Sequence, residues 1–311
     1  MRVVFAGTPG FSVSCLRALI EADGMDVVGV VSQPDRKSGR GMKLTPSAVK
    51  QAALDAGIDV ITPEKLRDND EALAWLQSKQ TDFLIVVAFG MILPKTWLDA
   101  VSISPVNVHA SLLPRWRGAA PIERSLLAGD AETGVCIMQM EEGLDTGGIY
   151  ARRTLPISAT MTGSELWSAL AAMGAELLVE TLPKVGTGLM PEPQPENGVT
   201  YAHKITNEER IIDWRKTAVE IDRLVRCFSP RPGVRTRCHG KWLKLIAGEP
   251  LACTSGQEEG SVAGANRYLE VVCAEGSVYR ITELQPEGKK PMAAGDFLRG
   301  AQLGTGDLLN N

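Results

Sequence analysis

The residues best suited to chemistry lie near the middle of the chain, at Asn107 and His109. Alternate residues of a strand point to the same face, so an expected strand over 105–109 puts this amide and this imidazole side by side. Ligands of open α/β sheets bind beyond the carboxyl ends of the strands. A purely structural role is the simpler interpretation of an isolated histidine. The strand end, the nearby asparagine and a loop fixed by Pro114 favour a catalytic one.

A carboxylate, Asp145, follows in a loop that is rich in glycine, Gly143-Leu144-Asp145-Thr146-Gly147-Gly148. Glycines let a backbone turn sharply and approach a ligand closely. An aspartate in such a loop can also simply cap its own backbone. Beside an Asn/His strand end, however, Asp145 is a credible third member of a site that donates hydrogen bonds and moves protons.

Other familiar catalytic signatures are absent from the sequence. It contains no P-loop, GxSxG or HExxH motif. Residues 7–10 read GTPG rather than GxGxxG, and Pro9 removes an amide donor that a pyrophosphate would use, so a nicotinamide dehydrogenase is disfavoured. Cys227, Cys238 and His239 do not have a usual zinc spacing, and we expect no metal.

The elements that must position these residues alternate between strands and helices. Apolar runs at 2–6, 26–31, 82–88 and 105–109 predict strands buried on both faces, with helices between them. This order predicts a doubly wound, mostly parallel, Rossmann-like α/β sheet. A further strand pair at 134–140 and 148–154, and a long helix over 163–182, complete this part. Thr162 and Glu165 form a plausible capping box for that helix.

The composition changes after this helix. Residues 183–200 are rich in Pro and Gly, which is typical of a linker. A short helix near 216–227 and short β runs over 234–283 follow. We therefore predict a catalytic domain over 1–190, a linker over 191–206 and a small OB-like β-barrel domain over 207–311.

The composition is that of an ordinary globular protein. The chain has 311 residues, of which 44% are hydrophobic and 23% charged, and a net charge of −4. No apolar run approaches the roughly 20 residues that cross a bilayer, and the N-terminus enters a strand pattern without a signal-peptide pattern. We expect a cytoplasmic protein whose six cysteines are free thiols.

The overall negative charge conceals two basic segments, at 33–50 and 223–244. The first has a single acid, Asp35, and the second has none. Either segment alone could be a solvated surface. Two of them in an acidic protein, one beside an expected OB-like barrel, favour contact with nucleic-acid phosphates.

Five motifs, in order along the whole chain, resemble those of the folate-dependent N-formyltransferases. The motifs are FAGTPGF at 5–11, QPDRKSGRGMKLTPSAVK at 33–50, NVHASLLPRWRGAAPI at 107–122, GLDTGGIY at 143–150 and LQPEGKKPMAAGDFLRG at 284–300. The basic loop with GRG, and the later GKK, are similar to the members of this family that act on tRNA. The chain departs from the family pattern at Gly10, Met42 and Arg231, none of which belongs to the Asn/His/Asp set.

The resemblance implies a role for each motif. Asn107, His109 and Asp145 would be the catalytic residues, and Ser111, Leu112, Leu113 and Pro114 would flank the folate. The formyl donor would be 10-formyltetrahydrofolate, and the acceptor would be the α-amino group of methionine on initiator tRNA. Formyl transfer develops an oxyanion that an amide can stabilise, and it needs a proton carrier such as histidine. We expect no covalent intermediate.

The tRNA contacts are predicted from charge placement on the two basic segments. The predicted residues are Arg36, Lys37, Arg40, Lys43, Arg231, Arg235 and Arg237. We expect the protein to act as a monomer. Two alternatives remain open: a formyltransferase that acts on an amino sugar nucleotide, and a non-catalytic RNA-binding protein.

Overall fold

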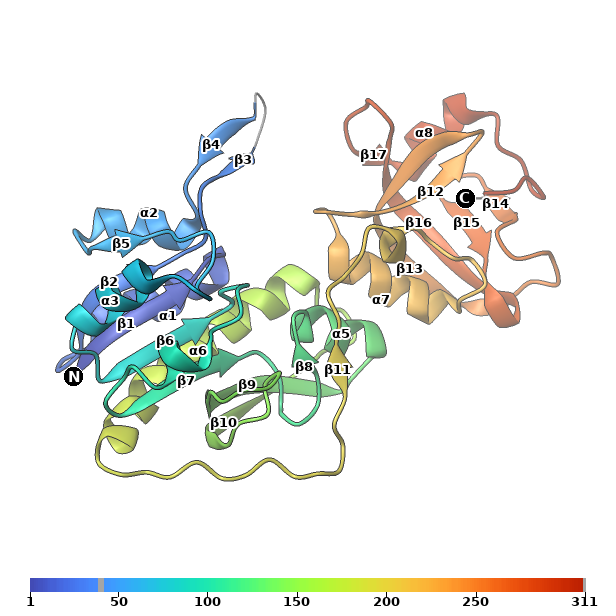
Figure 1. Cartoon of the computed structure of the whole chain (residues 1–311). Helices are drawn as coiled ribbons and strands as arrows, with labels where there is room; N and C mark the ends of the chain where they lie inside the picture. Colours follow the sequence, from blue (N-terminus) through green and yellow to red (C-terminus); the bar gives the residue numbers. More distant parts are fainter. Residues whose placement is uncertain (39–41, 310–311) are drawn as a thin grey trace. The chain divides into compact units, whose positions relative to one another are not determined.

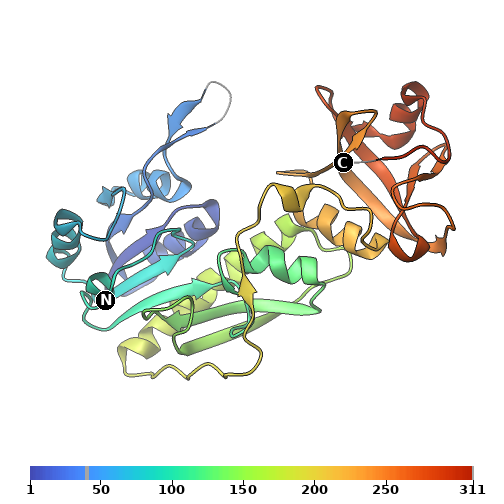
Figure 2. The same ribbon diagram turned by 45° about the vertical axis from the view of Figure 1, so that its right-hand side comes forward.

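The computed structural model describes residues 1–38 and 42–309, which divide into two compact units. The first contains Met1–Ser125, Ala131–Pro156 and Leu166–Lys204. The second contains two short segments, Leu126–Asp130 and Ile157–Glu165, and the chain from Ile205 onward. Residues 191–204, which the composition predicts as a linker, thus cluster with the first unit. Figures 1 and 2 show the chain from two directions.

A seven-stranded sheet forms the centre of the first unit, in the order β10-β9-β7-β6-β1-β2-β5. The strands are β1 (Arg2–Gly7), β2 (Asp26–Val31), β5 (Val60–Ile61), β6 (Phe83–Val87), β7 (Ser104–His109), β9 (Glu132–Gln139) and β10 (Ile149–Pro156). The five neighbouring strands β5, β2, β1, β6 and β7 are parallel to one another. Strand β9 is antiparallel to β7, and β10 is antiparallel to β9. The predicted mostly parallel, doubly wound sheet is confirmed.

Helices cover both faces of this sheet. They are α1 (Gly10–Glu21), α2 (Ala48–Asp55), α3 (Asp70–Ser78), α4 (Lys95–Leu98), α5 (Pro121–Ala128) and α6 (Gly163–Gly186). Val4, Leu84 and Val86 pack on one face with Leu76 of α3 and Trp97 of α4. The long helix α6 crosses the sheet on its other face (Figures 1 and 2), where it packs close to Val108 of β7.

Two helix starts test the capping predictions. Thr162 and Glu165 bond reciprocally at the start of α6, with Thr162 N donating to the carboxylate at 2.9 Å, as the capping box requires. The second helix start is that of α2: the sequence predicts a helix over 45–56 with Thr45 as its N-cap, and this cap is wrong. Ser47 caps the helix instead by accepting the Lys50 N–H at 3.0 Å, because Thr45 is already paired in a strand.

That strand belongs to a small hairpin that projects from the first unit (Figure 1). It pairs β3 (Arg36–Ser38) with β4 (Lys43–Thr45) in antiparallel register. A shorter pair joins β8 (Arg117–Gly118) to β11 (Tyr201–Ala202), so the segment after α6 returns along β10 and pairs with the loop after β7.

The second unit is an antiparallel β domain, as the sequence predicts. Its strands are β12 (Val234–Cys238), β13 (Lys241–Thr254), β14 (Val262–Ala265), β15 (Leu269–Val272), β16 (Ser277–Pro286) and β17 (Met292–Ala293). They pair in the order β12-β13-β16-β15-β14, with β17 on β16. The helical elements are η1 (Glu208–Arg210), α7 (Ala218–Phe228), η2 (Ala274–Gly276) and α8 (Ala294–Ala301).

Candidate active site

The carboxyl end of β7 presents Asn107 and His109 on the same face of the sheet, as strand alternation predicts. Asn107 is the register partner of Val86 on β6, and both polar side chains are buried. After His109 the chain turns sharply. The Ser111 hydroxyl donates to the Arg115 carbonyl at 2.6 Å, and Trp116 N donates to Thr200 Oγ1 at 2.9 Å. These bonds fix the loop that returns to the site at Gly118.

The loop between β9 and β10 carries Asp145, which has a positive φ of 54°. Glycine is required beside it for close approach. A Cβ on Gly147 would lie 2.0 Å from the Gln139 carbonyl oxygen. The loop therefore packs directly on the end of β9, and this places the Asp145 carboxylate over the end of β7.

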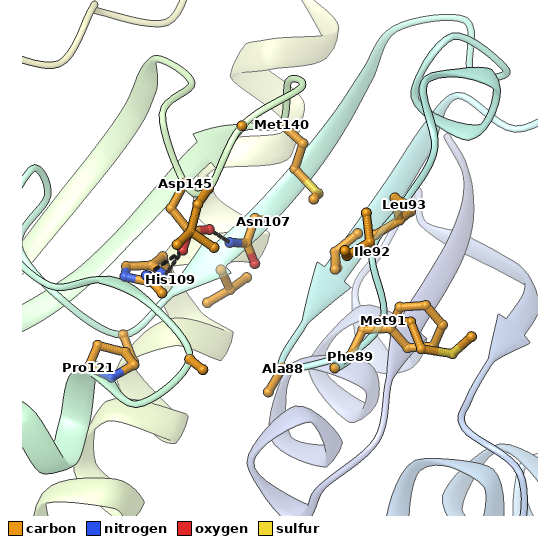
Figure 3. A pocket seen from close by; sticks show the side chains of 18 of the residues that line it. Ala88, Phe89, Met91, Ile92, Leu93, Asn107, His109, Pro121, Met140 and Asp145 are labelled. Atoms are coloured by element: carbon orange, nitrogen blue, oxygen red, sulfur yellow. Dashed lines mark hydrogen bonds and ion pairs between the residues drawn. The ribbon is translucent and has the colours of Figure 1, made fainter. Parts of the chain in front are cut away.

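The Asp145 carboxylate collects polar contacts from two other segments of the chain. Its Oδ1 accepts Asn107 Nδ2 at 3.2 Å, and its Oδ2 accepts the Gly118 N–H at 2.8 Å. His109 Nδ1 lies 3.6 Å from the same Oδ2. Figure 3 shows the three side chains pointing toward one another. The Asn/His/Asp set predicted from the sequence is thus brought together in space.

The other histidine nitrogen defines the tautomer. His109 Nε2 lies 2.9 Å from the Trp116 carbonyl oxygen, and a carbonyl can only accept, so Nε2 carries a proton. A second proton on Nδ1 would point at the Asp145 carboxylate. The imidazole can therefore exchange a proton at Nδ1 while Nε2 holds the ring in place.

Asn107 keeps one N–H for a ligand. Nδ2 has two hydrogens, and one bond goes to Asp145. Its other contact is the Met138 sulfur at 3.9 Å, which is a weak acceptor. The amide can therefore donate to an oxyanion that forms above it.

The set faces a cavity of about 930 Å³ within the first unit. Across from the three polar side chains lies the loop after β6, whose residues 88–93 bring Phe89, Met91, Ile92 and Leu93 to the opposite wall (Figure 3). This loop is held by Thr8 Oγ1, which donates to the Phe89 carbonyl at 2.8 Å, and by Gln33 Nε2, which donates to the same carbonyl at 2.9 Å. The result is a largely apolar slot with polar groups at one side.

The predicted folate residues do not line this cavity. Leu113 is buried with Cys136, Met138 and Ile149, and the Ser111 hydroxyl is used inside its own loop. Leu112 lies against Gly134, and the Pro114 carbonyl accepts the Thr200 N–H at 3.4 Å. Their contact with folate stays a prediction; in the structure they support the loop that carries Trp116 and Gly118.

Sequence reasoning missed Gln194, which lies in the segment predicted to be a linker. Its Nε2 donates to the carbonyls of Asp145 and Gly147, both at 2.8 Å. Its Oε1 accepts two bonds from Arg117, at 3.0 and 2.7 Å. A single amide thus ties the Asp145 loop to β8. This role cannot be predicted from the sequence, because the Gly and Pro residues around Gln194 are typical of a solvated linker.

The residues predicted to contact tRNA fall on two surfaces, one in each unit. Arg36, Lys37 and Lys43 are exposed on the β3–β4 hairpin, whereas Arg40 lies outside the described residues. In the second unit Arg231 is exposed beside β12, which carries Arg235 and Arg237.

Cys136 of β9 lies opposite His109 of β7 in the sheet. Burial raises the pKa of the Cys136 thiol, the register partner of His109, to about 11, so its thiolate is scarce at neutral pH. Over residues 1–38 and 42–309, no group of three or more His, Cys, Asp or Glu side chains could hold a metal ion.

No helix in these ranges is long and apolar enough to span a membrane.

Comparison with known families identifies the class of protein. Residues 1–182 match the formyl transferase family, and residues 204–302 match the formyl transferase C-terminal domain. The chain belongs to the formyl transferase family, which confirms the resemblance of its motifs.

Full-length relatives make the comparison more specific. A methionyl-tRNA formyltransferase from Dechloromonas aromatica is 47% identical over 308 residues, which cover 99% of this chain and 98% of the relative. One from Neisseria meningitidis serogroup B is 46% identical over 311 residues, 99% of this chain and 100% of the relative.

Solved structures share the fold at low sequence identity. A sugar 3N-formyl transferase, crystallised with dTDP and 5-N-formyl-THF, has a TM-score of 0.68 at 19% identity and covers 93% of this chain and 99% of its own. A methionyl-tRNA formyltransferase from Clostridium thermocellum has a TM-score of 0.55 at 15% identity, over 80% of this chain and 93% of its own.

The first prediction concerns the three polar residues of the site. Asn107→Ala, His109→Ala and Asp145→Ala are each expected to lower kcat/KM for formyl transfer at least about a hundredfold, because each removes a hydrogen-bond or proton-transfer group at the reacting centre. Steady-state kinetics measures the loss, and circular dichroism verifies folding. The exposed Asn197→Ala is the matched control. Full activity in a folded Asn107→Ala protein would remove this residue from the mechanism.

The second prediction concerns Gln194 as a positioning residue. Gln194→Ala should lower kcat about ten- to a hundredfold, with a smaller change in KM, because the Asp145 loop loses its anchor while the apolar wall over 88–93 is untouched. Gln194→Glu keeps an acceptor for Arg117 but loses the donor to the Asp145 and Gly147 carbonyls, so it should be equally impaired. The exposed Gln77→Ala is the control. A fully active Gln194→Glu enzyme would show that the donated bonds are unimportant.

Proposed function

We propose that this protein transfers the formyl group of 10-formyltetrahydrofolate to the α-amino group of methionine on initiator tRNA, for the start of translation. The observation that carries the proposal is the convergence of Asn107, His109 and Asp145 at the wall of one cavity. Membership of the formyl transferase family supports the reaction. Relatives of nearly equal length that are named methionyl-tRNA formyltransferase support the acceptor.

The reaction begins when the neutral amine attacks the formyl carbon. The carbonyl π bond opens, and negative charge develops on the formyl oxygen. Asn107 donates its remaining N–H to this oxygen, while its other N–H stays hydrogen-bonded to the Asp145 carboxylate. Because the amide is buried and already oriented, little reorganisation is needed as the charge appears.

A proton must then move from the attacking nitrogen to the leaving folate nitrogen. The His109–Asp145 pair accepts the amine proton and returns one to the folate as the C–N bond breaks, so the pair ends in its starting state. The bond from His109 Nε2 to the Trp116 carbonyl holds the ring during both transfers. No covalent bond to the protein forms.

The cavity fits a folate in size and chemistry. Its apolar wall over 88–93 suits a flat ring system, and a volume of about 930 Å³ is typical of cofactor-sized sites. Arg67 and Lys95 also line it and can attract the carboxylates of a folate tail. Structures of the same fold have been crystallised with tetrahydrofolic acid and with 5-N-formyl-THF, which supports the assignment.

The tRNA is proposed to contact basic residues in both units. Arg36, Lys37 and Lys43, together with Arg40, form one group, and Arg231, Arg235 and Arg237 form the other. Lys and Arg neutralise phosphates and release counterions, which makes such binding depend on salt. The proposal includes a monomeric protein in the cytoplasm, where translation begins.

An amino sugar nucleotide is the alternative acceptor. Sugar formyl transferases share this fold, with TM-scores of 0.68 and 0.67 for two of them. The basic β3–β4 hairpin favours RNA, because three exposed cations at one hairpin suit a polyanion better than a single nucleotide.

The third prediction tests the proposed function directly. The purified protein is incubated with 10-formyltetrahydrofolate and either methionine-charged initiator tRNA or a dTDP-linked amino sugar, with Asp145→Ala as the inactive control. Mass spectrometry of the released amino acid or sugar should detect formylmethionine and no formylated sugar. Formylation of the sugar alone would establish the alternative, and no product with either acceptor would refute the reaction.

A further inference from the structure

A second cavity, of about 390 Å³, lies within the second unit. Its wall combines the start of β12 and the residues just before it, the start of β13, residues 285–288, and Asn207 and Arg210 at η1. Arg210, Arg235 and Lys244 bring three cations to this space, and Glu287 is an acid in the same lining. The function proposed above assigns a tRNA contact to Arg235 but gives no role to Arg210, to Lys244 or to the cavity itself.

The arrangement of these cations is unfavourable for the sheet by itself. Arg235 on β12 and Lys244 on β13 are register partners, so two like charges lie directly opposite each other. Such a cross-strand pair destabilises a sheet unless something compensates the charge. Within residues 1–38 and 42–309, no ion pair joins Arg210, Arg235 or Lys244 to a carboxylate.

The titration of neighbouring groups agrees with an excess of positive charge. Burial, followed by the charges of Arg231 and Arg210, lowers the pKa of the Lys244 ammonium. Two acids lie near the cations. Glu287 accepts the Trp242 backbone N–H at 3.2 Å, and the pKa of Glu208 is lowered by hydrogen bonds from its own backbone and Thr206, then by the charges of Arg210 and Arg235. An anion inside the cavity would relieve the remaining repulsion.

Trp242 holds one of the cations in position. The Arg235 guanidinium lies 4.1 Å from the centre of the Trp242 ring, and the Arg237 guanidinium lies 4.4 Å from it. A guanidinium over an indole is restrained without losing its hydrogen-bond donors. Arg235 is therefore preorganised to bind a planar or tetrahedral oxyanion.

We propose that Arg210, Arg235 and Lys244 together grip one phosphate of the tRNA backbone in this cavity. The inference rests on the proposed function, because it takes the anion from the tRNA. A phosphodiester is favoured over a free anion because the cavity adjoins the acid-free segment 223–244, with exposed Arg231 beside its Pro232 and Gly233 lining. The strand can therefore continue past the cavity along further cations.

The test is the salt dependence of binding between the full-length protein and initiator tRNA. Lys244→Met keeps the side-chain stem but removes the charge, and Arg235→Gln removes the guanidinium. Lys216→Met, at an exposed lysine of the same unit outside the cavity, is the matched control. The proposed contact needs all three cations, so each cavity variant should lose this phosphate and reduce the slope of log K against log salt by about one unit, the value for a single lost phosphate contact.

The double variant separates one shared phosphate from two independent contacts. If both cations hold the same phosphate, Lys244→Met with Arg235→Gln should also reduce the slope by about one unit. A reduction of about two units would mean separate phosphates and would overturn the shared grip. Slopes equal to that of the control would remove the cavity from tRNA binding altogether.

Two further measurements keep the outcomes distinct. Thermal denaturation of Lys244→Met without tRNA should give a Tm no lower than that of the wild type, because a cross-strand repulsion is removed; a clearly lower Tm would indicate a structural role instead. Stabilisation of the wild type by inorganic phosphate, with unchanged tRNA slopes in the variants, would assign the cavity to a free anion. Formylation by the wild-type preparation is assayed in parallel, since its failure would refute the proposed function and not merely this cavity.

Discussion

The site depends on one partly buried carboxylate that makes polar contacts to two other segments of the chain. Asp145 accepts from Asn107 at the end of β7 and from Gly118 of β8, and it faces His109 Nδ1. Removing a carboxylate from water is costly unless its oxygens accept hydrogen bonds. These partners offset that cost, and they also fix the two side chains that act on the substrate. The contacts that stabilise this partly buried carboxylate are thus the same contacts that give it a function.

The surrounding backbone serves to hold that carboxylate in place. Gly147 lets its loop lie directly on β9, and Gln194 bonds the Asp145 and Gly147 carbonyls from the other side. Arg117 then connects Gln194 to the strand that supplies Gly118. Both sides of the loop are thus restrained by hydrogen bonds, which is what a site needs when its groups must be oriented before charge develops.

Much of this arrangement can be predicted from the sequence where the signal is local. Strand alternation places Asn107 and His109 on one face, and the apolar runs predict the parallel strands β6 and β1 that follow on one side of β7. Five motifs also identify the family. The role of Gln194 cannot be predicted in this way, because its partners lie more than 45 residues away and its own surroundings have the composition of a linker. The cavity wall over 88–93 cannot be predicted either, because its apolar residues look like a continuation of the buried strand before them.

The central claim is that Asn107 and Asp145 act as one unit, and a double-mutant cycle tests it most directly. Single-turnover rates of formyl transfer to charged initiator tRNA are measured for wild type, Asn107→Ala, Asp145→Ala and the double variant, all verified as folded. Residues that act together have strongly non-additive effects. The double variant should therefore be little slower than the slower single variant. A rate loss equal to the product of the two single losses would contradict the shared carboxylate as the basis of the site.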